Sequence, residues 1–448
     1  MSRVGDCTDS RLTRMAMAVV AQVSHACGAK GDFSGEKRHA LLPGNGSAPP
    51  PSATHSGNSL AQQPLRTIAT GRAARCSRRF EVHKQVVRPV GHSMFQQSIC
   101  RALVALALAL PAVSIADFAD VMTTPAGKSP LASKGLLNGL ALAGKRIVAV
   151  GQRGHIVYSD DQGASWQQAN VPVSSDLVAV SFPTPEQGWA VGHDGIVLHT
   201  TDAGAHWATQ LDGRRIGPLM MEQLRAQAAK GALGSAEDTS KLLDEAGRIA
   251  AQGAENPFLD VSFADARHGF IVGAFNLIFQ TSDGGQSWTS WFERTENPER
   301  LHLYSVHGLG QDIYITGEQG LVLKLDREAG RFRALGTPYK GTYFGVVGTG
   351  TAVIVYGLRG HAYRSTDSGA HWTPIDTGIQ EGITGAATFG SEGLALVSQA
   401  GSVLLSRDGG LHFAPYRLAK PSPAAAVAVT GDAIVTAGAL GVKTQALH

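Results

Sequence analysis

Five copies of an eight-residue motif carry the side chains that could do chemistry in this chain. The motif reads Ser/Thr-x-Asp-x-Gly-x-Ser/His-Trp, and its copies begin at Ser159, Thr200, Thr281, Ser365 and Ser406. A carboxylate at a fixed spacing from a hydroxyl or an imidazole could support acid–base catalysis or bind a metal ion. The Asp and the closing aromatic residue of each copy are Asp161 and Trp166, Asp202 and Trp207, Asp283 and Trp288, Asp367 and Trp372, and Asp408 and Phe413.

Turn chemistry favours a structural role for these residues. A carboxylate in a hairpin turn accepts backbone N–H groups, and the Gly supplies a positive φ. The Trp buries a large ring between sheets. His206, His371 and His412 stand at the Ser position of the motif, so we interpret them as repeat residues rather than metal ligands. We therefore expect a non-catalytic protein without a metal or a cofactor.

The motif recurs with a period that indicates a propeller. Its aromatic anchors lie at positions 166, 207, 288, 332, 372 and 413, with steps of 41, 81, 44, 40 and 41 residues, and position 332 belongs to a degenerate copy. Apolar runs such as residues 188–192 and 196–200, separated by Gly turns, are typical of strands. Four strands in a period of about 40 to 45 residues are the signature of a propeller blade. We predict an all-β, seven-bladed β-propeller over residues 117–448, with Asp-box repeats.

Seven units fill this part of the chain. The last unit has room for about three strands before the chain ends. Residues 117–124 precede the first unit, and we expect them to add the outer strand of the last blade, which would leave no exposed seam. The units begin near Leu136, Leu177, Phe258, Leu301, Tyr343, Ile383 and Ala424.

The two faces of such a propeller differ in sequence. The motif lies in the turn between the third and fourth strands, so the turns between the second and third strands lie on the opposite face, together with the connections between blades. These turns share a Gly-x-x-Gly pattern but carry different side chains, and function usually lies on such loops. Aromatic and Arg side chains favour a protein interface. We predict a partner-binding face made of Arg153, His193, Asp194, Asn276, Glu318, Arg333, Tyr339, Tyr343 and Arg359.

A ligand site is the alternative for the same turns. Convergent polar groups in a concave site are a fair indication of ligand binding. With Gln319 and Gln399 added, the turn residues could line the mouth of a central channel that binds a small ligand or a polysaccharide.

A long insertion interrupts the repeat between blades two and three, at residues 212–256. An amphipathic stretch over 218–229 and a second helix after the capping box of Ser235 and Asp238 predict a helical hairpin. The hairpin could form a lid or a docking ledge on the face opposite the motif. Alternatively, its helices only pack against the blades.

The N-terminal quarter differs from the rest of the chain. Residues 1–93 mix Pro, Ser, Gly and Arg without hydrophobic periodicity, which predicts a disordered extension. Residues 94–116 combine one Arg, an apolar run over 102–110 and a Ser-Ile-Ala end, the pattern of a secretory signal. We expect cleavage after Ala116, a start of translation at Met94 and a periplasmic protein.

Charge and cysteine usage follow the same division. Residues 1–116 hold 14 basic and 5 acidic residues, whereas residues 117–448 hold 25 and 31, a balance of −6. A net negative body disfavours nucleic-acid binding. All four cysteines precede residue 117, which excludes a disulfide framework, a Cys-ligated metal and a cysteine nucleophile in the main body.

The runs over 188–207 and 268–288, with the Gly-x-x-Gly turns, resemble the photosystem II stability and assembly factor family. The resemblance covers about residues 117–448. It implies an exported, non-catalytic seven-bladed propeller that binds a membrane protein precursor during complex assembly, with an Arg-rich face implicated. Arg153 and Arg359 occupy turns of that kind. We predict a monomeric periplasmic scaffold whose partner is an inner-membrane protein or complex.

A glycoside hydrolase of the sialidase type is the remaining alternative, because sialidases share the Asp-box. Sialidases carry an Arg-Ile-Pro motif ahead of the first box. The nearest string here, at residues 215–218, follows the second box and contains an additional Gly. A shared fold without the site does not carry the function.

Overall fold

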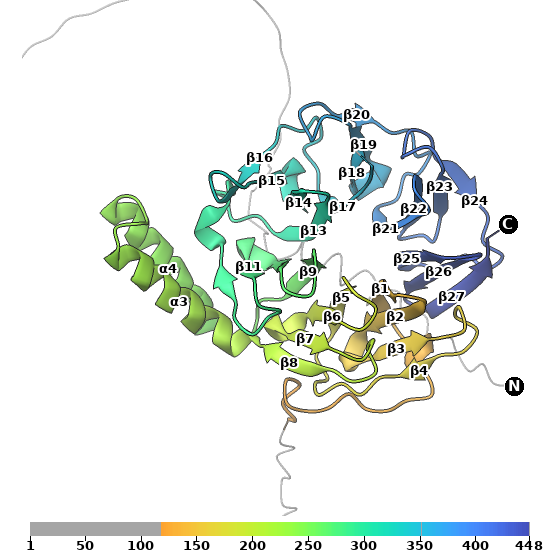
Figure 1. Ribbon diagram of the computed structural model, residues 1–448, viewed down its shortest axis with the longest axis horizontal. Helices are drawn as coiled ribbons and strands as arrows, with labels where there is room; N and C mark the ends of the chain where they lie inside the picture. The colour runs from red at the N-terminus through yellow and green to blue at the C-terminus, as the bar shows by residue number, and fades with distance from the viewer. Residues whose placement is uncertain (1–117, 351, 448) are drawn as a thin grey trace, which may run out of the picture. The chain divides into compact units, whose positions relative to one another are not determined.

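The computed structural model describes residues 118–350 and 352–447. The expected extension over 1–93 and signal segment over 94–116 lie outside the described residues. Within the described part, seven antiparallel sheets stand around a ring, each with its strands in chain order (Figure 1). The prediction of an all-β, seven-bladed propeller is confirmed.

The first four blades hold sixteen strands. These are β1 (Leu137–Ala143), β2 (Arg146–Gly151), β3 (Ile156–Ser159) and β4 (Gln167–Gln168); β5 (Leu177–Ser181), β6 (Gly188–Gly192), β7 (Val197–Thr200) and β8 (Ala208–Leu211); β9 (Phe258–Phe263), β10 (Gly269–Gly273), β11 (Ile278–Thr281) and β12 (Thr289–Ser290); and β13 (Leu303–Leu309), β14 (Asp312–Gly317), β15 (Val322–Asp326) and β16 (Arg331–Ala334).

The last three blades hold eleven strands. These are β17 (Tyr343–Thr349), β18 (Ala352–Gly357), β19 (Ala362–Ser365) and β20 (Thr373–Pro374); β21 (Ile383–Phe389), β22 (Gly393–Ser398), β23 (Val403–Ser406) and β24 (Ala414–Tyr416); and β25 (Ala424–Thr430), β26 (Ala433–Gly438) and β27 (Gly441–Ala446). The first strand of each blade lies toward the centre of the ring (Figure 1).

Every inner strand begins with the same irregularity. Its first residue pairs with the end of the second strand, the next residue is skipped, and regular pairing resumes at the third, as at Leu137 and Gly139 or Tyr343 and Gly345. A bulge of this kind bends the strand and increases its twist. The bulge recurs in all seven blades, so the chain passes from the preceding segment into the inner strand in the same way each time.

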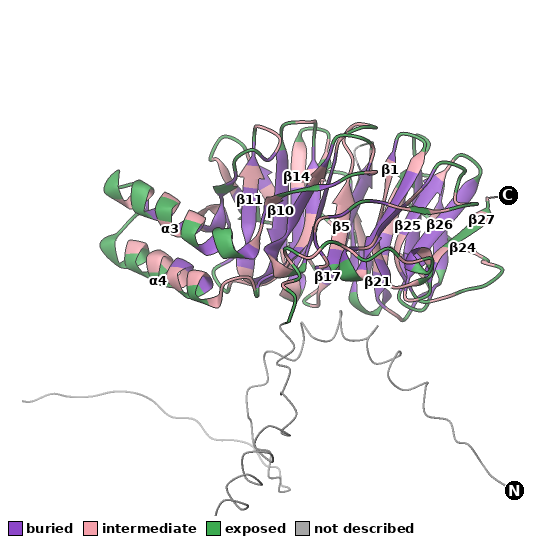
Figure 2. Ribbon diagram, turned by 90° about the horizontal axis from the view of Figure 1, so that it is seen from below, coloured by how far each residue is buried: buried purple, intermediate pink, exposed green. Residues whose placement is uncertain are grey.

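The core lies between neighbouring blades. Second strands are buried along nearly their whole length, because each is covered on both faces by adjacent sheets (Figure 2). Trp189 of blade two stacks on Phe263 of blade three, with centroids 3.6 Å apart. The Asp-box residues Trp207 and Trp288 are also buried between blades. Flat apolar surfaces on both sides of each sheet thus hold the ring together.

We predicted that residues 117–124 add an outer strand to the last blade. For the described positions 118–124 this prediction is wrong. Blade seven has three strands, and the segment folds into a local turn in which Asp120 accepts from the N–H groups of Met122 and Thr124. The following residues run along blade one, where Lys128 Nζ donates to the carbonyls of Gln168 and Ala169. The strong local turn at Asp120 prevents the extended conformation that a fourth strand needs.

The insertion forms the predicted helical hairpin, α3 (Gly213–Ala229) and α4 (Ala236–Gln252). Ser235 caps α4 by accepting from the N–H of Asp238, as expected. The first helix begins five residues before Pro218, because Asp212 caps it by accepting from the N–H of Arg214. No helix among the described residues has the length and apolarity that a membrane crossing requires.

Candidate functional site

The Asp-boxes form closed hydrogen-bonded turns on one face. In the first box, Ser159 Oγ donates to Asp161 Oδ1 at 2.7 Å and accepts from the N–H of Gly163 at 2.7 Å. The hydroxyl and the N–H of Ser165 both donate to the Asp161 carboxylate. These donors, led by the Ser165 hydroxyl, lower the pKa of Asp161 to about 2.

The boxes with His at the seventh position have the same geometry. The Nδ1 atoms of His206, His371 and His412 lie 2.6 to 2.7 Å from the carboxylate of their own box. The N–H of His371, followed by its ring, holds the pKa of Asp367 far below its usual range. The local bonds of the turn occupy these carboxylates, as the motif predicted. No group of three or more His, Cys, Asp or Glu residues suited to a metal occurs among the described residues.

The opposite face presents the turns between second and third strands. The third residue of five turns is left-handed without being glycine, with φ between 52° and 59°. A non-glycine residue in this region is uncommon and costs backbone energy, which makes these positions functional candidates. The five residues are Arg153, Asp194, Phe275, Gln319 and Arg359.

Close approach explains the glycine that follows in most of these turns. A Cβ on Gly320 would lie 2.0 Å from the carbonyl oxygen of Tyr339, and one on Gly360 would lie 2.0 Å from that of Ile379. No side chain fits such a gap, so the turn is anchored to the connection between blades by its glycine. The second and third residues are then free to vary.

Four of the predicted partner-binding residues project from these turns. Arg153, His193 and Arg359 are exposed and Asp194 is half-buried. They come from three blades of the ring: Arg153 from blade one, His193 and Asp194 from blade two, and Arg359 from blade five. The structure thus places them on one face without joining them into a single cluster.

Asn276 and Glu318 hold the backbone of this face together. Asn276 is fully buried; its Nδ2 donates to the carbonyl of Phe292. Its Oδ1 accepts from Thr295 Oγ1 and from Asn297 Nδ2. Glu318 Oε2 accepts from the backbone N–H of His302 at 2.9 Å. Both side chains therefore shape the connection from blade three to blade four.

The other three residues of the predicted partner-binding face do not form one group. Tyr339 is half-buried, tilts over the ring of His361 with centroids 4.2 Å apart, and donates its hydroxyl to the carbonyl of Leu358. Tyr343 is fully buried, and burial raises its pKa to about 12. Arg333 lies on the outer strand β16, where it pairs with Asp326 and Glu296. The structure joins the two tyrosines and leaves Arg333 apart from them.

Two features at or near the starts of the inner strands were not part of the predicted partner-binding face. Phe275, His302, Tyr304 and Phe344 follow one another in edge-to-face contacts, with centroids 4.6 to 6.3 Å apart, across blades three to five. The second feature is Asp260, whose pKa burial raises to about 6. Its signal was a departure from pattern, because the third residue of the other inner strands is Gly, Ala or Ser.

The helical hairpin lies against the outer side of blade three and projects away from the ring (Figures 1 and 2). The amide of Gln223 bonds to the backbone of Trp288 and Ser290 on either side of Thr289. The hairpin therefore covers the edge strand β12 and is not a lid over the centre. The string at residues 215–218 lies in its first helix, where a Cβ on Gly217 would meet Ala250, so it serves helix packing.

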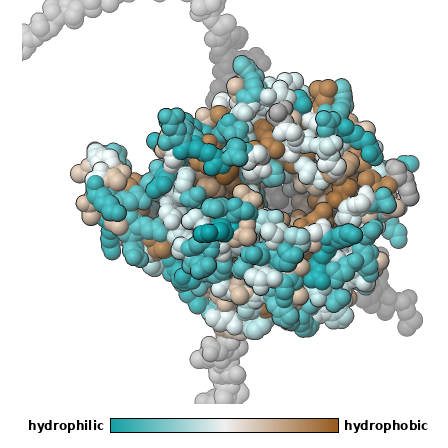
Figure 3. Space-filling view, viewed as in Figure 1, coloured by the Kyte–Doolittle hydropathy of each residue, from teal (hydrophilic) through white to brown (hydrophobic). Residues whose placement is uncertain are grey.

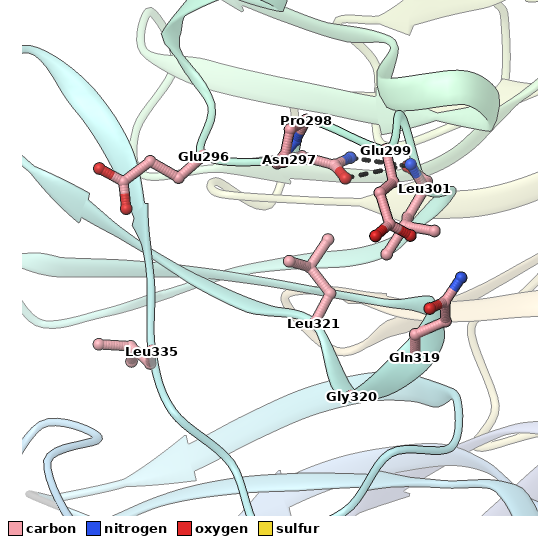
Figure 4. Close-up of a pocket in the computed structure, with 9 residues that line it drawn as sticks. All are labelled: Glu296, Asn297, Pro298, Glu299, Leu301, Gln319, Gly320, Leu321 and Leu335. Carbon is pink, nitrogen blue, oxygen red and sulfur yellow. Dashed lines mark hydrogen bonds between the residues drawn. The ribbon is translucent and has the colours of Figure 1, made fainter. Parts of the chain in front are cut away.

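Two hollows accompany these surfaces. Figure 3 shows an opening at the centre of the ring with hydrophobic residues on parts of its rim. A separate cavity of about 230 Å³ lies between the connection from blade three to blade four and the turn at Gln319 (Figure 4). Three leucines and two glutamates line it: Leu301, Leu321, Leu335, Glu296 and Glu299.

Comparison with known proteins gives a consistent family match. The family described as photosynthesis system II assembly factor YCF48 matches residues 140–231 and 247–390. The photosystem II assembly lipoprotein Ycf48 of Synechococcus sp. (strain CC9902) is 33% identical over 124 residues, which are 26% of this chain and 36% of that protein. The chloroplastic photosystem II stability/assembly factor HCF136 of Cyanidioschyzon merolae (strain NIES-3377 / 10D) is 38% identical over 80 residues, 16% of this chain and 18% of that protein. The match to these relatives spans about a third of their length or less.

Solved structures share the fold. YCF48 bound to a D1 peptide superposes with a TM-score of 0.52 at 14% identity, covering 70% of this chain and 94% of that one. YCF48 from Cyanidioschyzon merolae gives a TM-score of 0.51 at 15% identity, covering 71% and 97%. At this identity the likeness concerns the fold alone.

Proposed function

The chain belongs to the photosystem II assembly factor YCF48 family, and from this premise we propose that it is a non-catalytic periplasmic scaffold that binds a membrane protein while its complex assembles. The observation that carries the proposal is the family match, which runs from blade one into blade six with a gap at residues 232–246 inside the helical hairpin. A solved relative is bound to a D1 peptide, and an equivalent ligand here would be a segment of a membrane protein.

The state of the carboxylates supports a non-catalytic role. The box carboxylates are occupied by hydrogen bonds within their own turns. Hydrolysis of a glycoside needs a positioned pair of catalytic groups, in sialidases with a Tyr nucleophile. Tyr343 and Tyr356, whose pKa values burial raises, are closed off from a substrate. Purified chain incubated with a sialoside should therefore release no sialic acid, and robust hydrolysis would contradict the proposal.

Export to the periplasm rests on the sequence. The signal pattern over residues 94–116 would direct the propeller across the inner membrane, and the absence of cysteine after residue 116 suits either redox compartment. N-terminal sequencing of the exported protein should find a chain that begins at Asp117. A mature chain that retains residues before Met94 would contradict this start.

The partner is proposed to contact the face of the second-to-third-strand turns. Arg153, His193 and Arg359 are exposed charged or polar groups there, and the half-buried Asp194 and Tyr339 lie beside them. Asn276, Glu318 and Tyr343 act beneath the surface by holding the connections in place. Arg333 pairs with Asp326 and Glu296 at the outer side of blade four.

Co-purification tests this assignment. The tagged chain is expressed in its natural host and recovered from solubilised membranes, as wild type, as the Arg153→Glu/Arg359→Glu variant, and as the Arg267→Glu/Arg327→Glu variant. The last pair makes the same change of charge in exposed turns on the Asp-box face.

We expect one membrane protein to be retained by the wild type and by the Asp-box-face variant, and lost from the Arg153→Glu/Arg359→Glu variant. Retention of that protein by all three chains would contradict the assigned face. Recovery of no membrane protein with the wild type would contradict the scaffold itself. A chain lacking residues 214–255 tests separately whether the hairpin serves as a docking ledge, because the partner would then be lost on deletion.

A further inference from the structure

The connection between blades three and four is longer than the two connections that follow it in the chain. It runs over residues 291–302, twelve residues, whereas the connections over 335–342 and 375–382 have eight each. The additional length contains the short helix Phe292–Arg294 and a tight turn that ends at Arg300. The turn stands beside the blade-four turn at Gln319 and forms one wall of the cavity (Figure 4).

This wall is fixed in place by buried polar bonds. Asn297 Oδ1 accepts from the N–H of Leu301, and its Nδ2 donates to the carbonyl of Leu301 and to Asn276. Arg300 is held at a φ of +55°, a strained conformation for arginine. Its guanidinium pairs with Glu245 of α4 and lies over the ring of Phe292. The helical hairpin thus braces the wall through Arg300.

The cavity lining combines three leucines with two glutamates and the polar residues Asn297 and Gln319. Leu321 points into the gap between the two walls, while the side chains of Glu296 and Glu299 lie on opposite sides of this view (Figure 4). Arg333 pairs with Glu296, but the ion pairs of the described residues leave the exposed Glu299 without a cation. The nearest arginine in sequence, Arg300, is occupied by Glu245.

The size of the cavity suits one side chain. At about 230 Å³ it is smaller than most sites for small molecules, which measure roughly 300–1,000 Å³. An aliphatic side chain from a polypeptide fits such a space, and its flanking residues would pass the carboxylates. An anionic lipid headgroup or an acidic peptide would meet like charge there.

We propose that this cavity docks a basic segment of the partner polypeptide, with an aliphatic side chain among Leu301, Leu321 and Leu335 and a flanking Lys or Arg beside Glu299. The inference rests on the proposed function, because it names the chemistry of the partner segment. It differs from the arginine-bearing turns of the same face, which would attract acidic groups. The two surfaces together would orient a partner that carries both charges.

Fluorescence anisotropy with short labelled peptides tests the proposal on the folded propeller. The basic probe is Gly-Ser-Arg-Leu-Arg-Ser-Gly, and the matched acidic probe replaces both Arg with Glu. The variant Glu299→Arg reverses the charge at the cavity, and Glu328→Arg makes the same change in an exposed turn of blade four on the Asp-box face. A third variant, Leu321→Ser, removes the apolar anchor, and its fold is checked by circular dichroism.

We expect the basic probe to bind the wild type and Glu328→Arg equally. It should bind Glu299→Arg at least about tenfold more weakly, because the new Arg repels the basic residues of the probe and slows its association. The acidic probe should not bind. Equal binding of both probes, or no loss on Glu299→Arg, would overturn the proposal. Absence of any binding of the basic probe at 1 mM would also overturn it, while co-purification of the membrane protein would still decide the scaffold function on its own.

Discussion

The carboxylates of this propeller differ in whether their hydrogen-bond donors are near them or far from them in the sequence. The bonds around Asp161 come from residues within the same eight-residue motif, so the sequence alone predicted its role and its hydrogen-bond partners. Asp260 instead accepts from the N–H of Val306 in the next blade, 46 residues along the chain. Comparison of the repeats marks Asp260 as an exception, but no residue near it in sequence identifies its partner. Side-chain direction was equally hidden for Asn276, which lies on the predicted turn, and for Tyr343, the first residue of β17; both side chains are buried.

Asp260 should make stability depend on pH in the direction opposite to that of the box carboxylates. Part of the residue remains exposed, yet the neighbouring strands enclose its carboxylate closely enough for burial to raise its pKa to about 6. A folded pKa above the unfolded value means that the folded state holds the proton more tightly. The stabilising contribution is therefore present below about pH 4 and is lost as the pH rises to 6, a change of at most about 3 kcal/mol.

Comparison with Asp260→Asn isolates this effect, because the amide does not titrate. The free energy of unfolding in urea is measured for both chains at intervals from pH 4 to 7. The wild type should lose stability relative to the variant over this range. In the control, Asp265→Asn, the wild type should gain stability relative to the variant as the pH rises from 2 to 4, since His268 lowers the pKa of Asp265. A constant difference between wild type and Asp260→Asn would contradict the burial of this carboxyl.

Amphipathic periodicity predicted the two helices of the insertion, but it could not predict which surface they cover. The apolar positions Met220 and Leu224 show only that one side of α3 is buried. The location is decided by Gln223, a polar residue whose amide bonds to the backbone of Trp288 and Ser290. Periodicity treats such a residue as solvent-facing, so the docking of α3 along the edge strand β12 had no sequence signal.

The variant Gln223→Ala should weaken the contact between the helical hairpin and blade three and lower the free energy of unfolding. It would leave the N–H of the buried Ser290 and the carbonyl of Trp288 without their partners, at a cost of about 1–3 kcal/mol. Urea unfolding measures the loss, and hydrogen exchange should show faster exchange of the Ser290 amide. The control Arg225→Ala removes an exposed side chain of the same helix and should change stability by less than about 0.5 kcal/mol. Equal stability of Gln223→Ala and Arg225→Ala would show that the amide does not hold the hairpin.

Ring closure is a property of the whole molecule, and here prediction from sequence succeeded only in part. The number of blades and the starts of the inner strands follow from the period, which can be measured separately in every repeat. The contact between the last and the first blade is not part of the repeat, so the period does not predict it. Blade seven ends with β27, whose edge lies beside the first box, where Thr444 Oγ1 donates to the carbonyl of Gly163. Packing of Leu137 and Ala149 against Ala437 and Val442 joins the first and last blades.

Two truncations distinguish closure by packing from closure by a shared strand. A chain that begins at Gly127 loses the turn at Asp120 and its bonds to Val171 and Ser174, but every strand of blade seven remains. A chain that ends at Gly438 loses β27 and exposes one edge of β26, whose residues Val435 and Ala437 are buried in the intact ring. Hydrogen exchange of the β26 amides should therefore stay slow in the first chain and become fast in the second, with a lower melting temperature for the second alone. Fast exchange of β26 in the chain that begins at Gly127 would mean that the N-terminal segment supports the last blade after all.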